Sequence, residues 1–308
     1  MDKKKKTFSI VIPVYGNEEN LPVTLPYIID HLSLLSEYNV EIIMVCDGSP
    51  DNSWEVMKSY KNSYPDLFRI YNFDKNYEAA QAQCCGIEKA TGDVIGCIAA
   101  DLQEPFELFA PMLEKWEEGY KLVGATRAKR NDSFGKVISA GLYHRFFHGI
   151  NPKYPSGGFA MFVMDRSLVA PFLSRVTKER MFQLALLEIV DKPYYIEYER
   201  RKREIGKSGY NLKKLLLLTS GKFMVETDRL FYWMMFAGAG VGMISLVIGV
   251  VSFCMTTSRL LSLMFALLGI FCGIIISLIG MLGVSIFHNI RHLIALDQPR
   301  YTIKEKIE

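Results

Sequence analysis

Residues 94–105 read Val-Ile-Gly-Cys-Ile-Ala-Ala-Asp-Leu-Gln-Glu-Pro. The first part of this stretch, 94–100, is an uninterrupted apolar run of the kind found in strands that are buried on both faces. Asp101 and Gln103 follow it directly. Strands covered on both faces belong mainly to parallel sheets, because crossover helices pack on each side. The stretch therefore predicts an inner strand of an α/β fold with polar side chains at its carboxyl end.

The chain before this strand alternates between strand and helix patterns. Three apolar, β-branched runs predict strands, and three segments between them have helical spacing. The strands are 8–14, 41–46 and 68–73, and the helices are 20–36, 53–60 and 78–90. Such alternation predicts a mostly parallel, Rossmann-like sheet with right-handed crossovers.

Polar residues gather just after each of the four predicted strands. They are Pro13, Tyr15 and Asn17, then Asp47 and Ser49, then Asn76, and finally Asp101 and Gln103. Ligands of open α/β sheets bind outside the carboxyl ends of the strands, so these residues predict one common crevice. The chain has no Gly-x-Gly-x-x-Gly or Walker-type loop, which argues against a dinucleotide or ATP site of the usual kinds.

Asp101 and Gln103 are candidate metal ligands. They are two residues apart, and in extended chain their side chains point the same way. A carboxylate and an amide oxygen suit Mg²⁺ or Mn²⁺ that is shared with substrate phosphates and waters. The alternative is that Asp101 caps a helix, as aspartates at strand ends often do.

Two apolar stretches follow the α/β pattern, at 230–255 and 260–287, and neither contains a charged side chain. Each exceeds the roughly 20 residues that cross a bilayer, so two transmembrane helices are predicted. The short link 256–259 makes them an antiparallel hairpin. Basic residues are common before and after the hairpin, whereas the turn has only Arg259. By the positive-inside rule, we expect both chain ends and the α/β domain to lie in the cytoplasm.

These features predict four parts in a multi-pass membrane protein. They are a cytoplasmic domain (1–211), an amphipathic juxtamembrane segment (212–229), the hairpin (230–287) and a cytoplasmic tail (288–308). The net charge is only +3. Its basic excess clusters beside the predicted membrane, which favours anionic lipid over nucleic acid as the partner.

Four motifs lie at 12–21, 46–51, 100–105 and 206–210. Together they resemble the family-2 glycosyltransferases, and most closely the polyprenyl-phosphate glycosyltransferases such as bactoprenol glucosyltransferases and dolichyl-phosphate mannose synthase. The resemblance implies a GT-A fold followed by a membrane hairpin. It also implies transfer of a sugar from a nucleoside diphosphate donor to polyprenyl phosphate, with inversion. UDP-sugars are the favoured donors, UDP-glucose first, with undecaprenyl phosphate as acceptor at the bacterial inner membrane.

The same resemblance implies roles for individual residues. Asp101 and Gln103 would hold Mg²⁺ or Mn²⁺ on the diphosphate, and Arg127 would lie near it. Asp101, Arg127, Arg200 and Arg203 are the expected catalytic residues. The expected nucleotide-binding residues are Pro13, Tyr15, Asn17, Asp47, Ser49, Asn76 and Asp101.

The acceptor phosphate is already anionic, so cations matter more there than a general base. The resemblance assigns Arg200, Arg203, Lys207 and Ser208 to the lipid phosphate. The alternative is a basic collar that only attracts anionic lipid. An amphipathic helix predicted at 134–149 either receives the prenyl chain or is an ordinary core helix.

The chain departs from the family pattern in several places. Ala99 stands where relatives often have the first aspartate of Asp-x-Asp, and 156–159 lacks an acidic residue, for which Asp165 is one substitute. These departures motivate a second hypothesis, a non-catalytic nucleotide-binding scaffold or regulatory subunit. A processive polysaccharide synthase, the third, requires more spans than two. We also expect a homo-oligomer, with Gly238, Gly242, Gly269 and Gly273 allowing close helix contacts.

Overall fold

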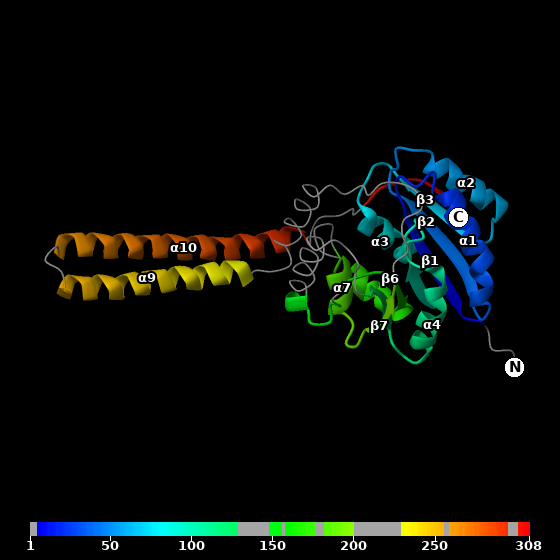
Figure 1. Ribbon diagram of the computed structural model, residues 1–308. Helices are drawn as coiled ribbons and strands as arrows, with labels where there is room; N and C mark the ends of the chain where they lie inside the picture. The colour runs from blue at the N-terminus through cyan, green and yellow to red at the C-terminus, as the bar shows by residue number, and fades with distance from the viewer. Residues whose placement is uncertain are drawn as a thin grey trace. The chain divides into compact units, whose positions relative to one another are not determined.

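The computed structural model describes residues 5–128, 148–155, 158–176, 182–199, 229–255, 259–294 and 301–308 (Figure 1). The chain forms two compact units. Residues 1–210 together with 298–308 make the first, here called the head, and residues 211–297 make the second, which contains the hairpin.

The head is built on an 8-stranded sheet with the order β7-β5-β6-β4-β1-β2-β3-β8. Strands β6 and β8 are antiparallel to their neighbours, and the other pairs are parallel. The strands are β1 (Thr7–Val14), β2 (Asn39–Cys46), β3 (Phe68–Phe73), β4 (Val94–Cys97), β5 (Leu122–Arg127), β6 (Phe159–Asp165), β7 (Tyr194–Tyr198) and β8 (Ile303–Ile307). The predicted mostly parallel α/β domain, followed by two long apolar helices, is confirmed.

Helices cover both faces of the sheet (Figure 1). The helices of the head are α1 (Leu21–His31), α2 (Ser53–Ser63), α3 (Ala79–Lys89), α4 (Phe109–Glu117), α6 (Val169–Leu173) and α7 (Phe182–Glu188), with short 3₁₀ turns at Leu32–Leu35, Phe106–Leu108 and Arg166–Leu168. Alternate residues of β1 enter different cores. Val11 joins the core under α3, α6 and α7, whereas Ile10 and Ile12 join the core under α1, α2 and α4. Burial on both faces explains why these strands read as continuous apolar runs.

Strand β4 ends at Cys97, three residues before the end predicted from the apolar run. The backbone N–H of Ile98 still donates to the Val11 carbonyl of β1, at 3.1 Å. The next bond of this ladder requires an N–H on residue 13, which is a proline. Proline has no N–H, so the ladder stops and the chain turns away before Asp101.

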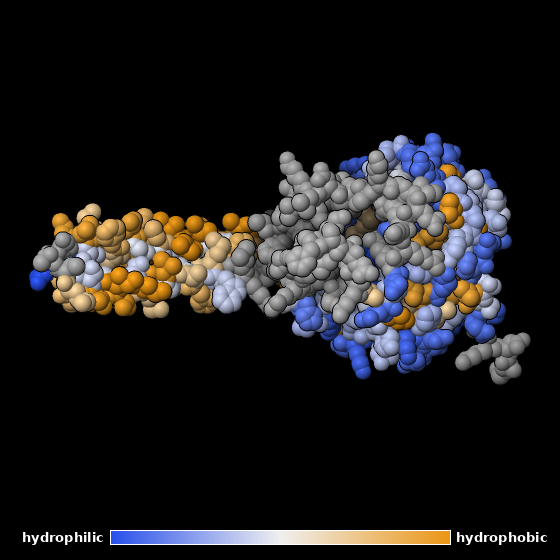
Figure 2. Space-filling view, in the orientation of Figure 1, coloured by the Kyte–Doolittle hydropathy of each residue, from blue (hydrophilic) through white to orange (hydrophobic). Residues whose placement is uncertain are grey.

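The hairpin consists of α9 (Arg229–Met255) and α10 (Arg259–Ile294). Two segments are long and apolar enough to cross a membrane, Phe231–Met255 and Arg259–Phe287. Most of their large apolar side chains are exposed, and Figure 2 shows them as a hydrophobic surface along the hairpin. Such a surface requires lipid or further protein around it.

Glycines bring the two helices of the hairpin together. A Cβ on Gly238 would lie 2.6 Å from the Gly273 carbonyl oxygen, and a Cβ on Gly269 would lie 2.2 Å from the Ser245 hydroxyl oxygen. The Ser277 hydroxyl also donates to the Met235 carbonyl, at 2.9 Å. Gly238 and Gly269 therefore make close contacts within one chain, and the homo-oligomer stays a prediction.

The chain returns to the head after the hairpin. Strand β8 pairs antiparallel with β3, with Phe73 opposite Ile303 and Ile70 opposite Ile307. This arrangement differs from the predicted division, in which 288–308 was a separate tail. Residues 288–294 continue α10, and 303–307 cover the edge of the sheet. Covering that edge satisfies backbone groups of β3 that an open edge would leave to water.

Candidate active site

The polar residues predicted at strand ends lie on one edge of the sheet. Strands β3, β2, β1 and β4 are parallel neighbours, so their carboxyl ends point the same way. Strands β5 and β7 share this direction, because β6 is antiparallel to both β4 and β5. The ends of six strands thus border the candidate crevice.

The loops after β1 and β2 are cross-linked by hydrogen bonds. The Gly16 N–H donates to the Ser49 hydroxyl at 2.8 Å, and the Glu18 N–H donates to Asp51 at 3.0 Å. Ser49 in turn donates to Asp51 at 2.5 Å. Burial opposes ionisation of Asp51, but the hydrogen bonds from Ser49 and Ser53 outweigh it and lower its pKa. Ser49, predicted to bind nucleotide, thus holds two loops together in this structure.

The residues predicted at the end of β1 differ from one another in their exposure and in their contacts. Pro13 is half-buried within the strand, and the Tyr15 side chain is 50% exposed. The Asn17 side-chain oxygen accepts the Tyr15 N–H at 3.0 Å. Tyr15 therefore offers an open aromatic face at the crevice, while Asn17 fixes the backbone beside it.

Asp47 is a deeply buried carboxylate at this edge, with 1% of the residue exposed. Its Oδ1 accepts the Tyr77 N–H at 2.6 Å. Within the described part of the chain, its Oδ2 has no hydrogen-bond partner. Burial raises the pKa of Asp47 to about 6, against the effect of the backbone N–H groups of Tyr77 and Glu78, which lower it. A buried oxygen without a donor is costly, so this atom indicates a ligand that brings an N–H or O–H.

The loop after β3 lies directly against the loop after β2. Gly48 has φ +58°, and a Cβ on it would lie 2.3 Å from the Lys75 carbonyl carbon. Only glycine fits such an approach without movement of one loop. The exposed Asn76 then accepts the Glu78 N–H through its side-chain oxygen, at 3.2 Å. This packing delivers the Tyr77 N–H to Asp47.

Glu78 has a backbone conformation, φ 75° and ψ 149°, that is close to exclusive to glycine. The strain of a side chain in this conformation amounts to about 1–3 kcal/mol. We expect Glu78→Gly to raise the free energy of unfolding by about 1 kcal/mol, because it removes the backbone strain. The gain is smaller than the full strain, because glycine adds backbone entropy to the unfolded chain. Thermal unfolding of the full chain in detergent measures this. Glu55→Gly, inside helix α2, should lower it instead, and a lower midpoint for Glu78→Gly would contradict the assigned strain.

Asp101 and Gln103 do not lie in extended chain, so that part of the prediction is wrong. The chain turns at this point, and Leu102 has φ 51° in the left-handed region. The Asp101 carboxylate accepts the N–H of Gln103 at 3.3 Å, and Gln103 is 8% exposed. The turn follows from the early end of β4. It places both residues in one compact loop at the crevice edge.

Sequence reasoning gave no role to Glu104, which is 1% exposed. Its carboxylate lies 3.6 Å from the Arg127 guanidinium at the end of β5. It also accepts the Tyr198 hydroxyl, at 3.1 Å, from the end of β7. Glu104 therefore ties the Asp101 loop to the ends of two other strands. Its place in the Asp-Leu-Gln-Glu-Pro motif, beside the predicted ligands, was the available signal.

The structure places Asp165 far from this crevice. It is opposite Val94, the first residue of β4, at the amino edge of the sheet. Its carboxylate accepts the Trp116 indole N–H at 2.8 Å and the Ser167 N–H at 2.9 Å. Asp165 therefore caps a turn and does not replace the missing acidic residue near the acceptor.

Some predicted residues lie outside the described residues. They are Arg200, Arg203, Lys207 and Ser208, and most of the predicted helix 134–149. Strand β7 ends at Tyr198, on the crevice edge, so the chain enters the predicted acceptor segment from that edge.

The donor set at Asp101 suits a cation that is shared with a substrate. Among the described residues, no group of three His, Cys, Asp or Glu side chains forms a metal cage. One carboxylate and one amide oxygen match the way Mg²⁺ is usually held, with phosphates and waters completing the shell.

Comparison with known proteins decides the family. Residues 9–170 match the family described as glycosyl transferase family 2. The chain belongs to glycosyl transferase family 2. The match covers β1 to β6 and every crevice loop described above except the end of β7. The predicted resemblance and the GT-A fold are thereby confirmed, and the protein is a glycosyltransferase by family.

Two relatives extend this glycosyltransferase's likeness beyond the matched domain. The uncharacterized glycosyltransferase YkcC of Bacillus subtilis is 30% identical, with 97% of this chain and 93% of that protein covered. The undecaprenyl-phosphate 4-deoxy-4-formamido-L-arabinose transferase of Yersinia enterocolitica is 31% identical, with 70% of this chain and 66% of that protein covered. The chain is therefore homologous to undecaprenyl-phosphate sugar transferases.

A solved structure supports the fold of this family-2 chain. Glucosyl-3-phosphoglycerate synthase from Mycobacterium tuberculosis superposes with a TM-score of 0.52 at 15% identity, over 73% of this chain and 80% of that one. At this identity the likeness supports the fold alone.

Proposed function

We propose that this glycosyltransferase moves a sugar from a nucleoside diphosphate to polyprenyl phosphate, while its hairpin anchors it in a membrane. The observation that carries the proposal is the buried Asp47 carboxylate at the crevice, with its unpartnered Oδ2. The homology to an undecaprenyl-phosphate sugar transferase supports the acceptor class.

The nucleotide base is the ligand part that suits Asp47. Uracil and guanine both carry a ring N–H, and a buried carboxylate oxygen is a strong acceptor for it. Tyr15, half-exposed beside it, offers a ring on which a base can stack. These features serve UDP and GDP alike, so UDP, and UDP-glucose first, remains a choice made on resemblance.

The transfer step breaks the bond between the anomeric carbon and the diphosphate, and forms one to an oxygen of the lipid phosphate. The leaving nucleoside diphosphate takes the electron pair. Asp101 and Gln103 would hold Mg²⁺ or Mn²⁺, which supplies positive charge to the departing diphosphate. Because the attacking phosphate is already ionised, positioning by Arg200 and Arg203 replaces a general base.

The hairpin supports a membrane location for this chemistry. Its two apolar helices are long enough to span, and their exposed surface suits lipid tails. We propose that both ends of the hairpin and the head lie on the cytoplasmic side, where nucleotide sugars are made available to such enzymes.

The test is transfer of label from a panel of UDP- and GDP-sugars to undecaprenyl phosphate by the purified full chain in detergent. Parallel reactions contain Mg²⁺, Mn²⁺ or EDTA. Labelled lipid from one donor, lost with EDTA, would support the enzyme and identify its sugar. Nucleotide binding without product from any donor would favour the non-catalytic scaffold instead.

Nucleotide binding should depend on pH through Asp47. Its pKa is raised to about 6, so the acceptor carboxylate is mostly protonated at pH 5. Affinity for UDP should therefore fall about tenfold from pH 7 to pH 5, in proportion to the ionised fraction. Calorimetric titration at each pH measures it. The Asp47→Asn variant has lost the titrating carboxylate, so only the titration of UDP itself remains. Its affinity for UDP should be lower at pH 7 and should change less between pH 7 and pH 5. Equal pH profiles would contradict this role.

The same pKa has the opposite effect on folding. Between about pH 4 and pH 6 the native Asp47 holds a proton that the unfolded chain has released. The contribution of this group to stability therefore falls as pH rises through that window. Ligand binding and folding thus respond to pH with opposite signs at this residue.

A further inference from the structure

The segment that follows the hairpin reaches the candidate nucleotide site. Tyr301 stacks on Phe73, the last residue of β3, with ring centroids 4.8 Å apart and an angle of 16°. The Thr302 carbonyl accepts the Asp74 N–H at 3.3 Å, and its hydroxyl accepts the Tyr77 hydroxyl at 3.3 Å. One contact falls on the last residue of β3, and the other two fall on the loop that follows it.

That loop determines the position of the Asp47 carboxylate. The Tyr77 N–H is the donor to Asp47 at 2.6 Å, and the Tyr77 ring packs edge-on against Phe73 at 5.6 Å. Phe73 thus lies between the rings of Tyr301 and Tyr77 in the contact chain. A contiguous set of packed rings and hydrogen bonds runs from Tyr301 to Asp47.

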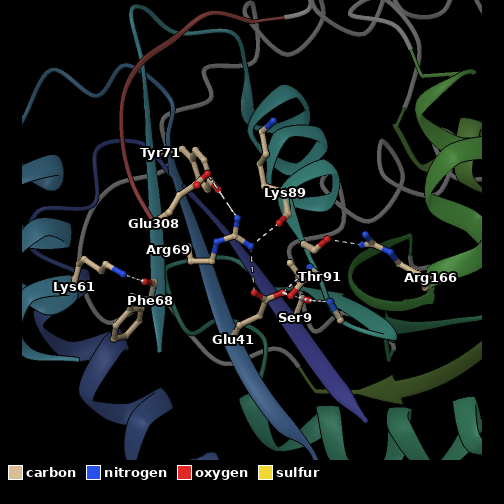
Figure 3. Close-up of polar contacts among 12 residues, drawn as sticks. Ser9, Glu41, Lys61, Phe68, Arg69, Tyr71, Lys89, Thr91, Arg166 and Glu308 are labelled. Carbon is tan, nitrogen blue, oxygen red and sulfur yellow. Dashed lines mark hydrogen bonds and ion pairs between the residues drawn. The ribbon is translucent and has the colours of Figure 1, made fainter. Parts of the chain in front are cut away.

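The rest of the segment is anchored independently of this loop. The Trp54 indole of α2 donates to Glu305 at 3.0 Å. At the end of the segment the Tyr71 hydroxyl of β3 donates to Glu308 at 2.8 Å, and Figure 3 shows Glu308 directed toward Tyr71 and Arg69. The Tyr301 hydroxyl donates to Glu88 on α3 at 2.6 Å. Contacts on α2, α3 and β3 therefore hold the segment in place.

We propose that Tyr301 and Thr302 are positioning residues of the nucleotide site, acting on Asp47 through Tyr77. The proposal rests on the proposed function, because it assigns the site to a nucleotide. It has a consequence for assembly of the protein. Since both residues follow the hairpin in the chain, the site is complete only after the membrane helices have been synthesised.

The test compares Tyr301→Ala with Glu305→Ala in the full chain in detergent. Both variants remove a contact of the segment, but only Tyr301 stacks on Phe73, against which the Tyr77 ring packs. We expect Tyr301→Ala to weaken UDP binding about tenfold. The UDP affinity of Glu305→Ala should stay within about twofold of the wild type, even if its thermal midpoint falls as far as that of Tyr301→Ala. Tyr301→Phe keeps the stacked ring and should bind like the wild type.

Amide hydrogen exchange provides a readout that needs no ligand. In Tyr301→Ala the Tyr77 amide should exchange at least about tenfold faster, while amides of β1 remain protected. Glu305→Ala should leave Tyr77 unchanged. Equal exchange at Tyr77 in the two variants, or UDP affinity that simply follows the thermal midpoint, would overturn the proposal. If UDP fails to bind the wild type, the proposed nucleotide is wrong, and exchange at Tyr77 still decides the positioning role.

Discussion

Asp101→Asn should lower the rate of sugar transfer by about 10²–10³-fold, the loss typical of removing one group that stabilises transition-state charge. Asparagine retains an oxygen to accept the Gln103 N–H, so the loop should keep its fold. What is lost is the negative charge that, in the proposed function, would hold a divalent cation against the diphosphate. Initial rates over a range of Mn²⁺ concentrations should show both a lower maximum and a higher metal requirement.

Asp165→Asn is the matched control, because it makes the same chemical change at the amino edge of the sheet. It should retain the transfer rate, although its cap of the following turn weakens. UDP binding without metal should be equal in Asp101→Asn and the wild type, since Asp47 is untouched. Transfer at the wild-type rate in Asp101→Asn, with unchanged sensitivity to EDTA, would refute the metal assignment.

Arg127→Met should lower the free energy of unfolding by about 3 kcal/mol, because it removes the Arg127 cation that pairs with the buried Glu104 carboxylate. Glu104 has only 2% of its side chain exposed, whereas Arg127 has 22% exposed, and the Tyr198 hydroxyl continues to donate. Because of these two facts, we place the loss of stability at the lower end of the range for a broken buried ion pair. In thermal unfolding, the midpoint should fall by about 6–12 °C for a domain of this size.

The double variant Glu104→Gln with Arg127→Met removes the buried charge together with its partner. It should recover most of the lost stability, so the two single effects should not add. Additive effects, or an Arg127→Met midpoint equal to that of the wild type, would contradict the pairing. Transfer by the stable double variant then tests the role predicted for Arg127. Restored activity would mean that Arg127 serves Glu104, and persistent loss would mean that it also meets the diphosphate.

Two groups of side chains, one around Glu104 and one around Asp47, form different parts of the crevice. Asp47, Tyr77 and the loops after β1 and β2 form the side that we assign to the nucleoside. Glu104, Arg127 and Tyr198 connect the Asp101 loop with β7, the strand from which the chain enters the predicted acceptor segment. Glu104 thus joins the Asp101 loop to the ends of β5 and β7 through one buried carboxylate.

The sequence alone was enough for the parallel core, its strand ends and the two long apolar helices. Periodicity and apolar runs depend on local burial, which each segment of sequence records by itself. Contacts between distant segments carry no such local signal. The pairing of Glu104 with Arg127 and Tyr198, the turn that Pro13 imposes on the Asp101 loop, and the strain at Glu78 all depend on what lies beside them in space.

The C-terminal segment shows this division most clearly. Its sequence, polar and short, predicted only a tail, because an edge strand with one alternating apolar face resembles an exposed loop in composition. Tertiary structure decided that Ile303–Ile307 completes the sheet and that Tyr301 reaches the loop that holds Asp47. The sequence determined which residues are able to do the chemistry, through their type and their place at strand ends. Only folding decided which of them meet, because hydrogen bonds and packing between remote segments form after the backbone has brought them together.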